Sequence, residues 1–409
     1  RYLTLGNLHN ATLPSPNVAT DKRVPFDSDQ TMDTYRAAVG KLINSLSSVA
    51  KITPPLSIDS EQTIFRIDLR HYGWTSDPEF SDKWERVAAF YPYAIRGVDA
   101  RTETQIARET GSNVAWIRAD WFNFATSQPP LYHDLLGLVE RRQAPQALEA
   151  RLGIDLAKNL KEARAWRAGF LKSGVSKSNR LIERHPIATY SGYYYISYDT
   201  GHRNKSPETS FMRAPLGPAR ARLTDNRSMI FNHDGGEIIY SLPNGLQAYL
   251  LITAQGQRLD IAPFEIVQNG REEIINGISC ITCHQGGMRA PPGKQLNTML
   301  DEIGPKVVSL TSTFQERKLI ENLYVKPDKL QRTVTEDARR FQRAASASYG
   351  AFQPEGEPLS RLYDRFLYHV TTQGLADECA TEAAGRALVA ELQESVSRDI
   401  HVTLAQLDV

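Results

Sequence analysis

Two of the three cysteines in this chain lie in one pentapeptide, Cys280-Ile281-Thr282-Cys283-His284. The spacing Cys-X-X-Cys-His is the attachment signature of c-type haem. On one helical turn, the two thiols can each add across a haem vinyl group, and the next side chain then supplies an imidazole to the iron. Histidine is a common axial ligand of haem iron. The pentapeptide therefore predicts one covalent haem c, held through Cys280 and Cys283, with His284 as the proximal iron ligand.

Two other uses of the cysteine pair are less consistent with the rest of the chain. A structural zinc site needs four ligands, but the only further cysteine is Cys379, and there is no second Cys-X-X-Cys pair. A thioredoxin-like redox pair would open a helix after a strand in a βαβ unit, and the surrounding pattern does not predict one. A single motif also means a single haem, which argues against the dihaem peroxidases.

The sixth iron ligand is the open question that decides the chemistry. The usual partner of the proximal histidine is another histidine or a methionine, and no methionine follows Met299. His233 is the leading candidate, because the two glycines after it in "FNHDGGE" would let the backbone approach a flat cofactor. His133, His185, His369 and Met299 are the alternatives, as is an iron left open or closed by another group. A closed iron carries electrons, whereas an open one can bind peroxide or another small ligand.

Hydrophobic periodicity predicts the secondary structure. A strand with one exposed face is expected at 63–70, and an antiparallel meander is expected from strands near 237–242, 246–253 and 258–261. Helical spacing of apolar residues is found at 28–48, 81–91, 114–125, 147–171, 335–347, 359–370 and 388–396.

These segments predict an α+β fold that is predominantly helical. Residues 1–189 are expected to form a largely helical N-terminal region, and residues 190–270 a central antiparallel β-meander that packs near the haem. Residues 271–409 are expected to form a C-terminal helical domain like that of cytochrome c.

Composition excludes several partners. The formal net charge is only +1, so we expect neither nucleic acid nor an anionic membrane surface as a partner. No apolar run approaches the roughly 18 residues that span a bilayer, so no transmembrane segment is expected. The chain begins at Arg1 rather than at a methionine, and we expect it to be a mature or trimmed form.

Several longer motifs carry a family resemblance. They are "MDTYRAAVGKLINSLS", "FRIDLRHYGW", "WIRADWF", "PPLYHDLLGL", "SGVSKSNRLIERH", "FNHDGGEIIYSLPNGLQAYLL" and "NGISCITCHQGG". With these motifs the chain resembles a family of large, mostly uncharacterised bacterial c-type cytochromes that are common in planctomycetes and have a single Cys-X-X-Cys-His motif. The resemblance implies an exported haem protein, a sheet packed near the haem, and haem attachment at Cys280, Cys283 and His284.

The leading functional expectation is an exported monohaem c-type cytochrome that transfers electrons to a redox partner protein or within a larger redox assembly. Haem attachment takes place outside the cytoplasm, so a periplasmic or extracellular location is expected. One alternative is a haem enzyme, peroxidase-like or oxygenase-like, whose N-terminal domain forms a substrate pocket over an open iron. A second alternative is a haem-bearing structural subunit of a filament or surface complex.

Overall fold

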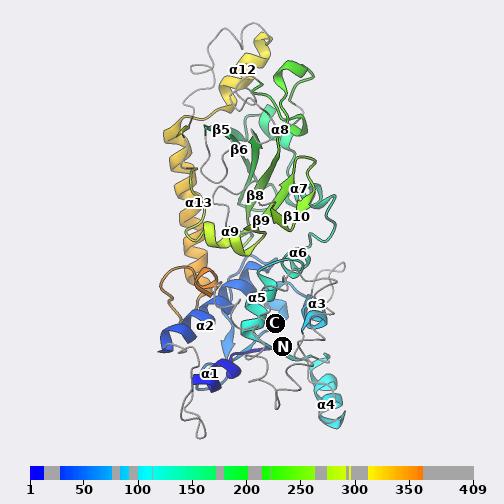
Figure 1. Ribbon diagram of the computed structural model, residues 1–409, viewed down its shortest axis with the longest axis vertical. Coiled ribbons are helices and arrows are strands. Elements are labelled where there is room, and N and C mark those ends of the chain that lie inside the picture. The colour runs from blue at the N-terminus through cyan, green and yellow to red at the C-terminus, as the bar shows by residue number, and fades with distance from the viewer. Residues whose placement is uncertain are drawn as a thin grey trace, which may run out of the picture. The chain divides into compact units, whose positions relative to one another are not determined.

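The structure is a computed structural model, and it describes residues 1–12, 28–75, 83–91, 100–112, 114–171, 179–200, 214–221, 223–262, 274–291, 294–295 and 312–362. The chain divides into two compact units (Figure 1). The first contains Arg1–Gly137, Ile281–Gln285 and Ala344–Val409, and the second contains Leu138–Cys280 and Gly286–Arg343.

The first unit contains a four-stranded sheet in the order β2-β3-β1-β4, in which β1 runs antiparallel to β3 and parallel to β4. Leu3, Phe65 and Ile117 lie in register on one face of this sheet and are at most 1% exposed. Helix α5 packs against β1, β4 and α2, so this buried face forms part of the core of the unit. The elements are β1 Tyr2–Thr4, α1 Gly6–Thr12, α2 Ser28–Ser45, β2 Leu56–Ser57, β3 Ile64–Arg66, η1 Leu69–Tyr72, α3 Lys83–Phe90, α4 Ala100–Thr110, β4 Trp116–Arg118, α5 Ala119–Thr126 and α6 Leu131–Leu135.

Several local predictions hold in this unit. The helix expected at 28–48 is α2, and the helix expected at 81–91 is α3. The strand expected at 63–70 is confirmed only over Ile64–Arg66, which form β3. It does not continue, because Asp68 accepts a hydrogen bond from the backbone N–H of Arg70 and caps the 3₁₀ helix η1. The segment 114–125 is a short strand, β4, before it becomes the expected helix, α5.

The second unit contains a seven-stranded sheet in the order β10-β9-β8-β7-β6-β5-β13, and all its paired strands are antiparallel. Helices cover both faces. Figure 1 shows α13 along one side of the strands and α7 on the other, in agreement with hydrogen bonds from β7 to each of these helices. The remaining elements are α7 Ala144–Leu152, α8 Leu156–Lys161, β5 Trp166–Leu171, β6 Asn179–Pro186, β7 Tyr193–Thr200, η3 Ala219–Ala221, η4 Arg227–Met229, β8 Gly235–Ser241, β9 Gln247–Thr253, β10 Arg258–Leu259, β11 Ile261–Ala262, β12 Ile274–Ile275, α9 Ile278–Cys283, β13 Lys294–Gln295, α12 Phe314–Leu323 and α13 Pro327–Ser348.

The predicted fold class is wrong in calling the protein predominantly helical, because helices make up about 43% and strands about 20% of the structure. The clearest error is the single helix expected at 147–171. Gly153, with a positive φ of 65°, ends α7, Asp155 caps α8, and the chain then enters strand β5. Both faces of β5 are buried, so it lacks the alternation of polar and apolar residues that identifies a half-exposed strand.

The expected C-terminal helical haem domain is also not found in the described part of residues 271–409. Strand β13 pairs with β5, and Asp337 of α13 accepts hydrogen bonds from Arg184 of β6 and Tyr195 of β7. The helix pattern of α13 was read correctly, but the helix is tied to the large sheet through Asp337. The helices expected at 359–370 and 388–396 lie mostly or wholly beyond residue 362, outside the described residues. Within the described ranges, no helix is both long and apolar enough to cross a membrane.

The glycine pair Gly235–Gly236 at the start of β8 has a role within the sheet. A Cβ at Gly236 would lie 1.8 Å from the carbonyl oxygen of Ser197 on β7, and a Cβ at Gly235 would lie 2.9 Å from that of Ile252 on β9. The pair therefore accommodates close approach of the neighbouring strands, which accounts for these glycines without a flat cofactor.

We expect Gly236→Ala to lower the free energy of unfolding by about 1–3 kcal/mol, the usual cost of overpacking. The new methyl group would force β7 and β8 apart, because its obstacle is backbone. Urea unfolding monitored by circular dichroism measures the effect. Gly286→Ala is the matched control, because its nearest neighbour would be a side-chain nitrogen at 3.5 Å. Equal stability of the two variants would contradict the prediction.

Candidate functional site

Helix α9 carries the first four residues of the pentapeptide, and one side of this helix is more buried than the other. Ile278 and Ile281 lie three residues apart on one side of the helix and are 2% and 4% exposed. Cys280 is half-buried and Cys283 is exposed. These two cysteines are also three residues apart, and 3.6 residues per turn places them on the side away from the isoleucines. His284 follows the last helical residue in a turn and is half-buried.

The turn after α9 is held against helix α13 of the second unit by two glycines. Gly287 has a φ of 92°, and a Cβ there would lie 3.0 Å from a ring carbon of Phe341. The Nε2 of Gln342 donates a hydrogen bond of 3.0 Å to the carbonyl oxygen of Gly286. A larger residue at 287 would be strained by its backbone conformation and would also meet the phenylalanine ring. The segment that follows the pentapeptide is therefore fixed by packing.

The local geometry of α9 fits covalent haem attachment. Both thiol-bearing residues share the less buried side of one short helix, and the histidine comes immediately after it. The described residues contain no group of three His, Cys, Asp or Glu side chains placed to hold a metal ion. Cys379 lies outside the described residues.

The candidates for the sixth iron ligand have different environments. His133 in α6 and His185 in β6 are both 0% exposed. His233, between η4 and β8, is half-buried. His369 and Met299 lie outside the described residues. The assignment of His233 to the iron stays a prediction.

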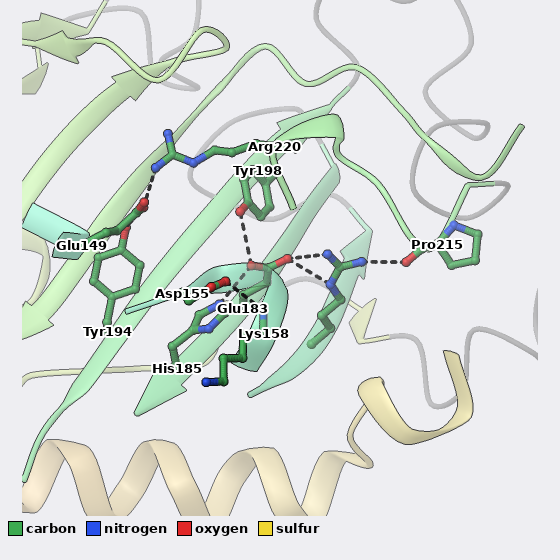
Figure 2. A network of polar contacts seen from close by, with 10 residues as sticks. Glu149, Asp155, Lys158, Glu183, His185, Tyr194, Tyr198, Pro215 and Arg220 are labelled. Atoms are coloured by element: carbon green, nitrogen blue, oxygen red, sulfur yellow. Dashed lines mark hydrogen bonds and ion pairs between the residues drawn. The ribbon is translucent and has the colours of Figure 1, made fainter. Parts of the chain in front are cut away.

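A buried polar network occupies one face of the large sheet, centred on Glu183 of β6 (Figure 2). Arg167, directly opposite on β5, donates to the Oε1 of Glu183 from Nε at 2.9 Å and from Nη2 at 2.5 Å. The Nε2 of His185 lies 3.0 Å from the other carboxylate oxygen, and the hydroxyl of Tyr198 donates to the same oxygen at 3.2 Å. The remaining guanidinium nitrogen of Arg167 donates to the carbonyl oxygen of Pro215 at 2.8 Å. All the polar atoms of Glu183 thus have partners.

Electrostatics keeps Glu183 ionised in this interior position. Burial alone would raise the pKa of its carboxyl group, but the charge of Arg167 and the hydrogen bond from His185 outweigh burial and lower the pKa to about 2. Burial raises the pKa of Tyr198 well above its ordinary value, and the charge of Glu183 raises it further. At neutral pH the network therefore contains one carboxylate, one guanidinium and one neutral phenol.

A second ion pair lies on the same side of the sheet. Arg220 donates from Nη2 to the Oε1 of Glu149 in α7, and the hydroxyl of Tyr194 donates to the same oxygen at 2.8 Å. The rings of Tyr194 and His185 are 6.1 Å apart, edge to face. Tyr194 of β7 thus links this pair to the network around Glu183, and Figure 2 shows both together.

His233 borders these networks and is neutral at ordinary pH. Its ring meets the ring of Tyr198 edge to face at 5.2 Å. Burial, and then the charge of Arg220, lower the pKa of His233 from 6.5 to about 4. A neutral imidazole is the form that a metal ligand requires.

The lowered pKa of His233 predicts a pH-dependent loss of stability. The unfolded chain takes up a proton near pH 6.5 and the folded protein only near pH 4, so stability is complete above pH 6.5 and falls as the pH drops towards 4. Urea midpoints at several pH values should therefore show a smaller acid-side loss in His233→Phe than in the wild type. His71→Phe is the control, because the His71 side chain is 58% exposed. If His233→Phe loses as much stability at acid pH as the wild type does, the lowered pKa of His233 is not the cause of that loss.

Sequence reasoning missed most of this network. It considered His185 and His233 as candidate iron ligands, but not Arg167, Glu183 or Tyr198. One signal was present: "RLIERHP" places charged residues at several positions of a segment that is a strand, and such charges need partners when the strand is buried.

The comparisons with known proteins do not place the chain in a family. No family model, curated protein or solved structure matches it. What the protein does is therefore inferred from the chemistry of the pentapeptide and from the environment of its residues.

Proposed function

We propose that this protein is a monohaem c-type cytochrome that transfers electrons. The observation that carries the proposal is the position of Cys280 and Cys283 on the less buried side of α9, with His284 directly after them. Cys280 and Cys283 would hold the haem, and His284 would bind its iron. When bound, the haem supplies a centre that gains and loses one electron.

The surroundings of α9 support the proposal in a second way. The buried isoleucines anchor the helix, and the glycine turn packed on Phe341 holds the segment that follows. A haem bonded at two positions of such a helix would be held by covalent attachment and by a packed scaffold. Such a scaffold would limit the change of structure when the iron gains or loses an electron, and an electron carrier needs that change to be small.

The first experiment tests haem attachment. The full chain is produced with an export signal in bacteria that assemble c-type cytochromes, then denatured and analysed by mass spectrometry and by a haem stain after gel electrophoresis. The expected result is one haem that stays with the denatured chain. A folded, exported chain without covalent haem would overturn the proposal.

The second experiment tests electron transfer against an open-iron enzyme. The reduced protein is exposed to carbon monoxide, and the absorption spectrum is followed while the potential is titrated. A closed iron should give a reversible one-electron transition and no spectral change with carbon monoxide. Rapid binding of carbon monoxide would reject the electron carrier in favour of a haem enzyme.

The proposal also includes a location and a partner. Covalent haem attachment takes place outside the cytoplasm, so the protein would act in the periplasm or beyond the cell. Its partner would be another redox protein or a larger redox assembly. Fractionation of cells that express the full natural gene, followed by haem staining, tests the location, and a cytoplasmic holoprotein would contradict it.

A further inference from the structure

Helix α13 contacts the turn that follows the pentapeptide and places arginines beside it. The Nε2 of Gln342 donates a hydrogen bond of 3.0 Å to the carbonyl oxygen of Gly286, which is three residues after Cys283. Arg343 follows Gln342 directly, and Arg339 lies three residues before it, about one helical turn away. Both arginines are exposed. The chain that leaves the pentapeptide therefore lies against a helix that carries two exposed positive charges at the contact.

The packing of Gly287 fixes the same contact. A Cβ at this position would lie 3.0 Å from a ring carbon of Phe341 and 3.2 Å from the Cα of Ala338. Ala338 immediately precedes Arg339. Arg289, two residues after Gly287, is exposed as well. Three exposed arginines thus border one packed contact, and we name them the arginine surface: Arg289, Arg339 and Arg343.

The two segments that meet at this contact lack negative charge. Residues 274–300 and residues 338–354 contain no aspartate or glutamate, although the net charge of the whole chain is only +1. The nearest exposed carboxylate on α13 is that of Glu336, about one turn before Arg339. Within the described part of the chain, no ion pair neutralises the arginine surface. Its positive charge is therefore a local property that the rest of the chain does not share.

Unpaired exposed charges attract molecules of opposite sign and orient them before contact. Cys283, which would hold the haem, is exposed as well, and at most about 10 Å of chain separates it from Gly286. We infer that the arginine surface is the docking site of an acidic redox protein. This inference rests on the proposed function, because such a partner would meet the chain beside its electron-transfer group.

Two other negatively charged occupants fit this surface less well. Nucleic acid is bound through a basic face that neutralises many phosphates, and three arginines on a nearly neutral chain offer few such contacts. A small anion needs a concave site with convergent donors, whereas these arginines are exposed. A protein with its own acidic surface can meet all three arginines at once and leave them partly hydrated.

The test uses the full haem-loaded protein and two electron donors of opposite charge. In a stopped-flow spectrometer, the ferric protein is reduced by a reduced plant-type ferredoxin, which is acidic, or by the methyl viologen radical, which is a cation. The rate with ferredoxin should fall as salt is added, because salt screens the attraction. In Arg339→Glu/Arg343→Glu, the rate with ferredoxin should be about tenfold lower. The rate with methyl viologen should rise in the same variant.

Arg142→Glu is the control, because Arg142 is exposed and lies two residues before α7, on the other side of the large sheet. Either single variant, Arg339→Glu or Arg343→Glu, should slow the reaction with ferredoxin more than Arg142→Glu does, although each changes the net charge equally. A rate that does not depend on salt, or equal effects of the three single variants, would overturn the inference.

Two further outcomes are informative. A DNA duplex that binds the wild type more tightly than ferredoxin does, at the same salt concentration, would overturn the inference in favour of nucleic acid. A chain without covalent haem would overturn the proposed function and this inference together. A haem protein whose rates are unchanged by the charge reversals would overturn only the docking site.

Discussion

Replacing Arg167 with methionine is expected to lower the free energy of unfolding by about 3–5 kcal/mol, the usual cost of removing one partner of a buried ion pair. The side chains of Arg167 and Glu183 are both 0% exposed. Methionine fills much of the space of the arginine stem but leaves the carboxylate of Glu183 without its cationic partner. Equilibrium unfolding in urea, followed by tryptophan fluorescence, measures the loss.

A surface pair provides the matched control for this experiment. Arg164, three residues earlier, pairs with Glu162 at 2.9 Å, and the two side chains are 47% and 49% exposed. Arg164→Met removes the same charge, but an exposed pair contributes only roughly 0–1 kcal/mol. Similar losses in the two variants would refute the special role of the buried pair.

The Arg167→Met variant also has an expected pH dependence. In the wild type the pKa of Glu183 is about 2, because Arg167 and His185 outweigh the effect of burial. Without Arg167 the effect of burial gains weight, so the pKa of Glu183 should rise. Protonation of Glu183 would then relieve the buried charge, and the deficit relative to the wild type should be smaller at pH 5 than at pH 7.5. A deficit that grows towards acid pH would contradict this account.

Replacing both Cys280 and Cys283 with serine is expected to abolish covalent haem completely, because no thiol of the pentapeptide would remain to form a thioether. Each single serine variant should keep at most one bond to the haem. The measurement is the haem retained by the denatured chain, relative to the wild type.

The third cysteine supplies the control for this prediction. Cys379→Ser also removes one thiol, but it lies outside the pentapeptide, so haem retention should equal that of the wild type. Covalent haem in the double variant, or its loss in Cys379→Ser, would show that attachment does not follow the pentapeptide.

The predictions of secondary structure succeeded where the signal lies within one continuous segment of the chain. Helix α2 was found from the spacing of Tyr35, Val39 and Leu42, which are all 0% exposed. Strands β8 and β9 were found because a Pro-Asn-Gly turn separates two runs of strand length. These signals are contiguous in the chain, so reading them required no knowledge of distant residues.

The predictions failed at β5 and β6. Strand β5 continues an apparent helix pattern, and β6 carries Arg180, Glu183 and Arg184, which are unusual in a buried strand. Their partners lie far away in the sequence: Arg180 pairs with Asp199, and Arg184 pairs with Asp337. Because the compensation comes from other strands and from α13, the local sequence resembles a surface turn.

The sequence by itself places two thiols and an imidazole within five consecutive residues, because their spacing is set by the covalent chain, and the haem proposal starts from that spacing. It also determined the helices that have one apolar side. Only the tertiary structure decided that residues 166–186 are strands and that α13 covers a sheet. The same is true of Arg167, Glu183, His185 and Tyr198, which form one buried network. The physical reason is that a buried charge is stable only beside its partner, and pairing across strands is set by the register of the sheet.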